Sequence, residues 1–319
     1  MIEEHIKVAV VCGGTSREAA VSRVSGKSVY DALQMSFDTV HILELDASTA
    51  ENLRSLNPDV VFPVLHGPPG EDGSLQGMLE ILGFPYVGSG VLASACAMNK
   101  KVAKDIFRSA GLPVAADAVV DLTVKDLGEQ AHVLRQKFPN GFVIKPIDQG
   151  SAIGVSFCRP GDSALDLLQD CAINFRIALA EELVIGKEIT AGILDTDQSV
   201  ALPVTEIFVN DGNWYDFDHR YTQGASAHIC PAQLPSDVYS EVQRVASAAH
   251  AALGCRDLSR SDFVVTHSGR VVLLELNSLP GMTPTSLYPE QAQAAGISFE
   301  LLVRRLVFSA YGRHYGERK

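Results

Sequence analysis

The sequence is short of positive charge. It has 26 lysines and arginines against 38 aspartates and glutamates, which gives a formal net charge of −12 at pH 7. A chain with this balance has no general basic field for a nucleic acid, so no nucleic-acid partner is predicted. An anionic ligand would need a local pocket of basic side chains.

Long apolar runs and closely spaced cysteines are missing as well. No stretch reaches the roughly 18 apolar residues that cross a bilayer, and residues 1–7 lack the apolar core of a signal peptide. The six cysteines include no C-x-x-C pair, which argues against zinc and for reduced, mostly buried thiols. We therefore expect a cytoplasmic protein with no membrane partner.

Aromatic residues are scarce, at 7% of the chain, but hydrophobic residues make up 46% of its 319 positions. Aliphatic side chains can therefore fill large cores. The length alone suggests about two to three domains.

Residues 1–98 alternate between apolar runs and helical patterns. The run at 7–12 is followed by Gly13-Gly14-Thr15-Ser16 and a helical stretch over 18–33, which predicts the start of a Rossmann-like unit. This turn could bind a nucleotide, hold a small anion at the helix N-terminus, or be purely structural. Further elements are expected as strands at 39–44 and 59–65 and a helix at 75–82.

The rest of the chain is α+β rather than regularly alternating. We expect a central domain at 99–182 and a C-terminal domain at 183–319. The expected strands lie at 141–145, 155–158, 178–183 and 187–194, and the expected helices at 100–110 and 299–311.

Two apolar runs near the C-terminus, 261–265 and 270–276, predict an antiparallel strand pair. If Ser268-Gly269 forms a two-residue turn between them, Asp262 and Glu275 face each other across the pair. Like charges in that position repel each other. This pattern predicts a cation on that face of the sheet.

An amide joins the two carboxylates. Asn277 follows Glu275 by two residues and so lies on the same face of the strand. These oxygen ligands suit Mg²⁺, which binds one or two carboxylates and shares its other positions with phosphates and water. The alternative is an exposed polar sheet face. The apolar neighbours favour buried strands instead, in which carboxylates need a partner.

Three other features are weaker taken alone. Lys145 precedes a glycine-bearing loop, 149–154, whose N–H groups could turn towards phosphates, although a Lys-Pro at a strand end is often a surface turn. The Walker pattern is absent, which excludes a P-loop enzyme. His66 alone is typical of an ordinary loop histidine, and Tyr221 lies in a polar loop that is either a mobile lid or a plain surface loop.

Ten ordered blocks together resemble D-alanine–D-alanine ligases along almost the whole chain. They are G-G-T-S-R-E at 13–18 with V-S at 21–22, H-G-P-P-G-E-D-G-S-L-Q-G at 66–77, P-Y-V-G-S-G at 85–90, M-N-K at 98–100, V-I-K-P at 143–146, G-S-A-I-G at 150–154, G-K-E-I-T at 186–190, Y-D-F-D-H-R-Y at 215–221, R-S-D-F at 260–263, and E-L-N-S-L-P-G-M-T at 275–283 with S-L at 286–287. The last block is the most specific.

The resemblance implies an ATP-grasp fold of the α/β and α+β class. An N-terminal Rossmann-like domain precedes a central and a C-terminal α+β domain, and ATP lies between the last two. The family also suggests a homodimer. The implied activity joins two D-alanines into D-alanyl-D-alanine through an acyl phosphate, for peptidoglycan precursor synthesis.

Site roles follow only from matching positions. For ATP they are Lys100 and Lys145 at the phosphates, Glu181 and Leu183 at the adenine, and Glu188 at the ribose. For Mg²⁺, with Mn²⁺ as an alternative, they are Asp262, Glu275 and Asn277. For the first D-alanine and the oxyanion they are Glu18, Ser151, Tyr221, Arg260 and the Gly281 N–H. For further substrate contacts, mainly the second D-alanine, they are His66, Arg220, Ser286 and Leu287.

Three positions depart from the family pattern. Asn99 replaces a usual Asp and is expected to be tolerated, whereas Ala152 removes a hydroxyl near the phosphates. Arg220 replaces a usual Lys and keeps its charge but not its shape. The alternatives are therefore a ligase with another D-amino acid or hydroxy acid as acceptor, or a weakly active nucleotide-binding paralogue.

Overall fold

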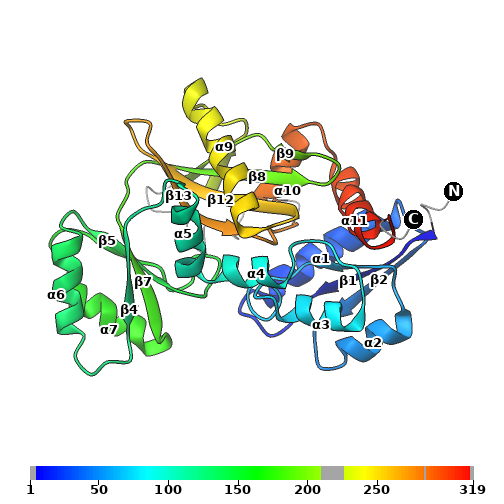
Figure 1. Cartoon of the computed structure of the whole chain (residues 1–319), viewed down its shortest axis with the longest axis horizontal. Helices are drawn as coiled ribbons and strands as arrows, with labels where there is room; N and C mark the ends of the chain where they lie inside the picture. Colours follow the sequence, from blue (N-terminus) through cyan, green and yellow to red (C-terminus); the bar gives the residue numbers. More distant parts are fainter. Residues whose placement is uncertain (1–4, 210–225, 284, 317–319) are drawn as a thin grey trace.

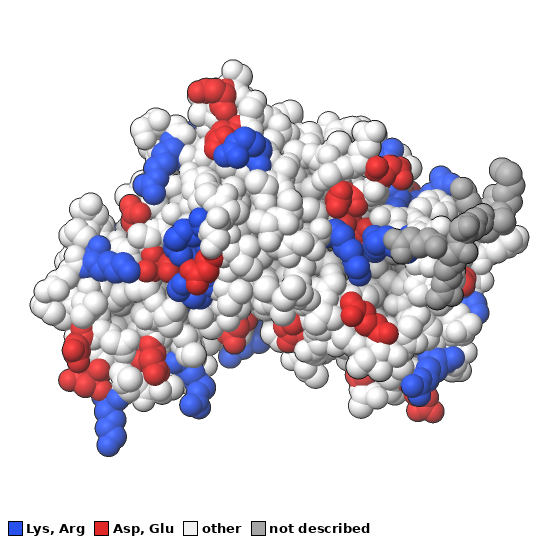
Figure 2. Space-filling view, viewed as in Figure 1, with Lys and Arg blue, Asp and Glu red and all other residues white. Residues whose placement is uncertain are grey.

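The computed structural model describes residues 5–209, 226–283 and 285–316. The described chain forms three sheets with helices packed around them (Figure 1). Figure 2 shows acidic and basic side chains interspersed on the face in view, without a broad basic area there. In the described ranges, no helix could span a membrane.

The N-terminal sheet is parallel, with β1 (Lys7–Cys12) between β2 (Thr39–Glu44) and β3 (Val60–Pro63). Alternate residues of β1 enter two different cores, Val8 and Val10 in one and Ala9 and Val11 in the other. A strand buried on both faces needs a continuous apolar run, as predicted for a Rossmann-like unit. The helices of this part are α1 (Ala19–Gln34), α2 (Thr49–Leu56) and α3 (Ser74–Leu82).

The central sheet is antiparallel and divides its two faces between helices and a cavity. In order, its strands are β4 (Asp117–Asp121), β7 (Ile177–Glu182), β5 (Phe142–Pro146) and β6 (Ser156–Cys158). Phe142 and Ile144 of β5 pack against the helices α6 (Gly128–Lys137) and α7 (Ala164–Asn174). Because side chains alternate along a strand, Val143 and Lys145 face the cavity on the other side.

The C-terminal sheet is the largest. In order, its strands are β11 (Ser226–Ile229), β10 (Thr205–Val209), β8 (Lys187–Asp195), β12 (Asp257–Val265) and β13 (Val271–Asn277), and β9 (Ser199–Ala201) pairs with β8. The helices that follow or interrupt it are α9 (Ser236–Leu253), α10 (Leu287–Ala294) and α11 (Phe299–Tyr315).

Helices from one segment pack on the sheet of another. Helix α5 (Lys100–Ser109) puts Ala103 and Phe107 into the core beneath the C-terminal sheet, and α4 (Val91–Met98) adds Ala93 to the same core. Helix α11 contributes to the core that contains Val8 and Val10 of β1. The three segments are therefore interlocked, and the domain limits at 98 and 182 stay a prediction.

The glycine turn after β1 is already filled by the protein itself. The Gly14 N–H donates to a carboxylate oxygen of Glu44 at 3.0 Å, and Arg23 binds the same carboxylate. A Cβ on Gly13 would lie 2.0 Å from that carboxylate. Of the three interpretations open from the sequence, the structural one fits, because Glu44 occupies the place of an external anion.

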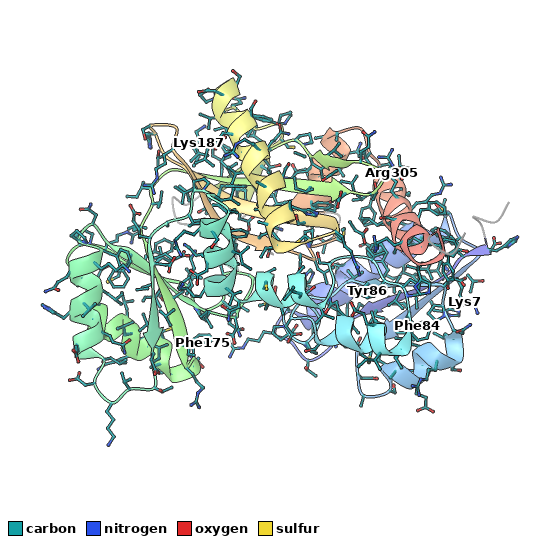
Figure 3. The ribbon with its side chains drawn as sticks, in the orientation of Figure 1. Lys7, Phe84, Tyr86, Phe175, Lys187 and Arg305 are labelled. Carbon is teal, nitrogen blue, oxygen red and sulfur yellow. The ribbon has the colours of Figure 1, made fainter. Side chains whose placement is uncertain are left out.

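The buried carboxylate of Asp257 joins the N-terminal and C-terminal parts. It accepts hydrogen bonds from the Gly88 N–H and from Ser309, both at 2.7 Å, and it pairs with Arg313. Arg313 also donates to the backbone oxygen of Tyr86 at 3.1 Å (Tyr86 is labelled in Figure 3). Asp257 has a left-handed φ of 64°, which this set of bonds holds in place.

We expect Arg313→Met to lower the free energy of unfolding by about 2–5 kcal/mol, because it leaves a buried carboxylate without its cation. Urea denaturation of both proteins would measure this. Arg305→Met, on the same helix but outside the Asp257 cluster, is the matched control. Equal stabilities of the two variants would contradict the role given to Asp257.

Candidate active site

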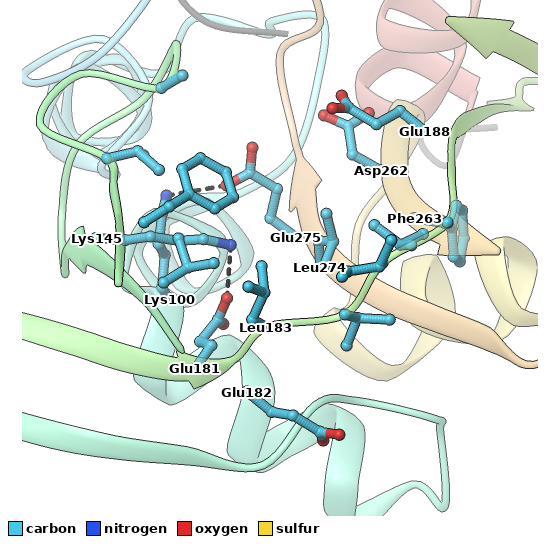
Figure 4. Close-up of a pocket in the computed structure, with 18 of the residues that line it drawn as sticks. Lys100, Lys145, Glu181, Glu182, Leu183, Glu188, Asp262, Phe263, Leu274 and Glu275 are labelled. Carbon is cyan, nitrogen blue, oxygen red and sulfur yellow. Dashed lines mark ion pairs between the residues drawn. The ribbon is translucent and has the colours of Figure 1, made fainter. Parts of the chain in front are cut away.

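A cavity of about 320 Å³ opens between the central and C-terminal sheets (Figure 4). One part of its wall is apolar and includes Val143 and Phe157 from the central sheet and Phe263 and Leu274 from the C-terminal sheet. The segment 182–186, which connects β7 to β8, closes one side. An apolar slot of this kind suits a planar base.

The segment 182–186 runs so close to the C-terminal sheet that its last residue has no room for a side chain. A Cβ on Gly186 would lie 2.2 Å from the backbone oxygen of Val265. Leu183 and Glu188 line the cavity on either side of this glycine. Glu188 lies on β8 beside Asp262 (Figure 4), at the polar end of the slot.

Two lysines reach the polar region of the cavity from different elements. Lys145 Nζ, on β5, lies 2.5 Å from Glu181 Oε2, and Lys100 Nζ, at the start of α5, lies 3.0 Å from Glu275 Oε2 (Figure 4). Lys100 also donates to the Gln149 backbone oxygen at 2.7 Å. Cations held at one end of an apolar slot suit a ligand with a base at one end and phosphates at the other.

Asp262 and Glu275 face each other, although the turn is not the predicted one. The prediction of a two-residue turn was wrong: the Thr266 N–H donates to the Arg270 oxygen at 3.0 Å, so three residues, 267–269, form the turn. This shifts the register by one residue. A bulge at Leu274 shifts it back, and Asp262 pairs with Glu275 as predicted.

The donor set is of the type that Mg²⁺ accepts. Asn277 Nδ2 lies 3.3 Å from Asp262 Oδ2, so the amide and both carboxylates are close together. Both carboxylates are paired with cations, Asp262 with Arg260 at 2.9 Å and Glu275 with Lys100. Two carboxylates and one amide are few ligands, but Mg²⁺ takes its other positions from phosphates and water. These residues therefore fit the ion.

The loop after β5 is strained and is held by the N-terminal segment. Ser151 and Ala152 both have left-handed φ angles, 45° and 59°. The Ser151 hydroxyl donates to the carboxylate of Glu18, which precedes α1. Gly154, with a φ of 72°, allows the loop to pass Pro146 at a distance that excludes a side chain. Glu18 and Ser151 are thus brought together from residues far apart in the sequence.

A second pocket, of about 340 Å³, adjoins this loop. Its walls include eight of the residues named from the sequence: Glu18, His66, Ser151, Arg260, Asn277, Gly281, Ser286 and Leu287. Arg260 lines this pocket and binds Asp262 of the first cavity through two hydrogen bonds of 2.9 Å. The Arg260–Asp262 pair therefore lies where the two pockets meet.

One end of the second pocket is the N-terminus of α10. Ser286 is the N-cap residue, and its hydroxyl is bonded to the Thr283 N–H at 3.0 Å. A Cβ on Gly281 would lie 2.9 Å from this hydroxyl, so glycine lets the chain pass close to it. Backbone N–H groups at a helix N-terminus favour a carboxylate.

His66 is buried at the wall of the second pocket. Burial, and then the nearby Arg260, lower the pKa of His66 to about 4, so its ring is neutral near pH 7. Among the described residues, its Nε2 atom has no hydrogen-bond partner. A buried ring nitrogen without a partner at a pocket wall is suited to bind a polar ligand atom.

Glu71 was not singled out from the sequence and lines the same pocket. Burial, and then repulsion by Glu18, raise the pKa of Glu71 to about 8. Its carboxyl accepts a hydrogen bond of 2.6 Å from the Gly67 N–H. The sequence signal was its place in the same glycine-rich loop as His66.

Arg220 and Tyr221 lie outside the described residues, as does most of the polar loop proposed as a lid. Its final residues, Ser226–Ile229, form β11. Asn99, one of the departures, is the N-cap of α5, and its side chain accepts from two N–H groups at 3.1 Å. Asparagine and aspartate cap helices equally well, so this departure keeps the helix start.

Comparison with known proteins agrees with this geometry. Family models for the D-ala D-ala ligase N-terminus and C-terminus match residues 44–89 and 106–308. A D-alanine–D-alanine ligase of Methylobacterium radiotolerans is 43% identical over 309 residues, 95% of this chain and 97% of the relative. One from Parvibaculum lavamentivorans is 44% identical with the same coverage. The chain belongs to the D-alanine–D-alanine ligase family.

Solved structures in this family confirm the ATP-grasp fold. A Bacillus anthracis D-alanine–D-alanine ligase complexed with ATP superposes with a TM-score of 0.80 at 27% identity, covering 98% of this chain and 99% of that one. A D-Ala:D-Ser ligase from Enterococcus faecalis has a TM-score of 0.80 at 29% identity, with coverage of 96% and 99%. The roles of single residues stay predictions.

We expect Glu71→Gln to make stability less dependent on pH. The pKa of Glu71 is about 8 in the folded protein against an ordinary value of 4.5, so the folded state binds the extra proton between these values. The contribution of Glu71 to the free energy of unfolding is complete below pH 4.5, and it is lost as the pH rises through about 8. Urea denaturation at about pH 6 and about pH 8.5 should show a smaller loss in the variant than in the unmodified protein.

The matched control for this measurement is Asp72→Asn, at the next position of the loop. If the unmodified protein and Glu71→Gln lost the same free energy of unfolding between the two pH values, the raised pKa given to Glu71 would be wrong.

Proposed function

We propose that this chain is an ATP-dependent ligase that joins two D-alanines into D-alanyl-D-alanine for peptidoglycan precursor synthesis. The observation that carries the proposal is the meeting of two pockets at the Arg260–Asp262 pair. One pocket has an apolar slot with lysines, and the other has a helix N-terminus and a carboxylate. Family membership supports the same activity.

The first pocket is suited to ATP. Adenine would lie in the apolar slot against the backbone at Leu183, with Glu181 near the base and Glu188 at the ribose hydroxyls. Lys100 and Lys145 would bind the phosphates. Mg²⁺ held by Asp262, Glu275 and Asn277 would supply positive charge to the phosphate oxygens.

The second pocket is suited to two amino acids. Glu18 would bind the ammonium of the first D-alanine. The hydrogen bond from Ser151 would orient the Glu18 carboxylate for this contact. That substrate's carboxylate would attack the γ-phosphorus of ATP, releasing ADP and forming an acyl phosphate. Arg260 and Gly281 line this pocket, and the guanidinium and the Gly281 N–H would stabilise the oxyanion that forms in the next step.

The second D-alanine would enter at the N-terminus of α10. Ser286 and the N–H groups there would receive its carboxylate, assisted by Arg220, with Leu287 and His66 as further contacts. Its amine would then attack the acyl carbon and displace phosphate. Tyr221 would complete the contacts of Glu18 and Ser151. Dimerisation and a cytoplasmic location remain predictions.

Product analysis tests the proposal. Incubated with ATP, Mg²⁺ and a mixture of D-alanine, D-serine and D-lactate at neutral pH, the protein should yield D-alanyl-D-alanine as the main product by mass spectrometry. Phosphate should appear only when D-alanine is present. A main product containing D-serine or D-lactate would identify another acceptor. ATP binding without amino acid-dependent phosphate release would identify a nucleotide-binding paralogue.

Glu275→Gln should lower kcat by about a hundredfold or more, because one charge of the Mg²⁺ site is lost and such an ion contributes several kcal/mol. The phosphate release assay would measure this at saturating ATP. The control is Glu241→Gln, a surface glutamate paired with Arg244 on α9. Near-normal kcat in Glu275→Gln would rule out the metal assignment.

A further inference from the structure

Lys104 is a buried cation that no role discussed so far uses. It lies one helical turn after Lys100 on α5, and only 1% of its side chain is exposed. Its Nζ lies 2.6 Å from Glu181 Oε1, while the other oxygen of Glu181 lies 2.5 Å from Lys145 Nζ. One buried carboxylate therefore holds two ammonium groups.

In this triad, burial and ion pairing act in opposite directions on the pKa values of Lys104 and Glu181. Burial lowers the pKa of Lys104, although Glu181 opposes the change. Burial would raise the pKa of Glu181, but Lys145 and Lys104 together hold it below its ordinary value. Counted at the ordinary ionisation of two lysines and one glutamate, the triad has a formal net charge of about +1 before any anion arrives.

The two lysines differ in what they can reach. Lys145 lines the first cavity together with Glu181, whereas Lys104 lies behind Glu181 and is not part of the cavity wall. Lys104 is also fixed by its helix, because its neighbour Ala103 and, one turn on, Phe107 lie in the core under the C-terminal sheet. Lys104 thus links that part of the molecule to Glu181 on the central sheet.

We infer that Lys104 is a positioning residue for the proposed ATP site: it holds the Glu181 carboxylate in place so that Lys145 can leave it for the phosphates. The inference rests on the proposed function. Without Lys104, the departure of Lys145 would leave Glu181 buried without a cation, which is strongly unfavourable. Lys145 would then stay with Glu181, and the phosphates would lose a ligand.

The test compares ATP with adenosine, which has no phosphates to attract Lys145. In Lys104→Met, calorimetric titration in the presence of Mg²⁺ should show affinity for ATP falling about tenfold or more relative to adenosine, the effect of one charge-assisted hydrogen bond. Lys101→Met is the matched control on the same helix, since Lys101 pairs with Asp105 at the surface. It should leave the ratio of the two affinities unchanged.

A double variant separates positioning from packing. Lys104→Met with Glu181→Gln removes the carboxylate that retains Lys145, so the ratio of ATP to adenosine affinity should return to that of the unmodified protein. This variant buries no unpaired carboxylate and remains informative if Lys104→Met does not fold. Equal weakening of ATP and adenosine in Lys104→Met, or a low ratio in the double variant, would overturn the inference. Failure of the unmodified protein to bind ATP would instead overturn the proposed function.

Discussion

A chain with a formal net charge of −12 must concentrate its cations where negative charge is to be bound. In the described structure, three cations that line the two pockets are each paired with a carboxylate. Lys145 is held by Glu181, and Lys100 by Glu275. Arg260 is held by Asp262 in the same way. The carboxylates keep the cations extended into the cavities, where arriving phosphates could compete for them.

These pairs also join the parts of the molecule. Lys100 and Lys104 extend from α5, whose residues Ala103 and Phe107 pack under the C-terminal sheet, to carboxylates on two different sheets. Ser151 of the central part bonds to Glu18 of the N-terminal part. A buried charge is stable only with its partner. If one segment moved away, it would leave unpaired charges in another segment. The electrostatics of the site and the packing of the three sheets therefore depend on each other.

The hairpin of β12 and β13 shows how far sequence reasoning reaches. The apolar runs predicted both strands, and the facing pair of Asp262 and Glu275 is present. The turn was wrong by one residue, and the bulge at Leu274 restored the pairing for a reason that the pattern did not contain. A bulge is one extra residue in one strand of a pair, and it leaves no periodic signal in the sequence.

The alternating N-terminal unit, the apolar strands and the ordered blocks that resemble one family could all be recognised from the order of the residues alone. These are local properties of spacing and residue type, so neighbouring residues suffice to reveal them. Three features can be seen only in the folded chain: Glu44 fills the glycine turn, Glu71 lies near Glu18, and Lys104 binds Glu181. Each of these depends on residues distant in the chain becoming close and losing water, and burial sets the strength of such interactions.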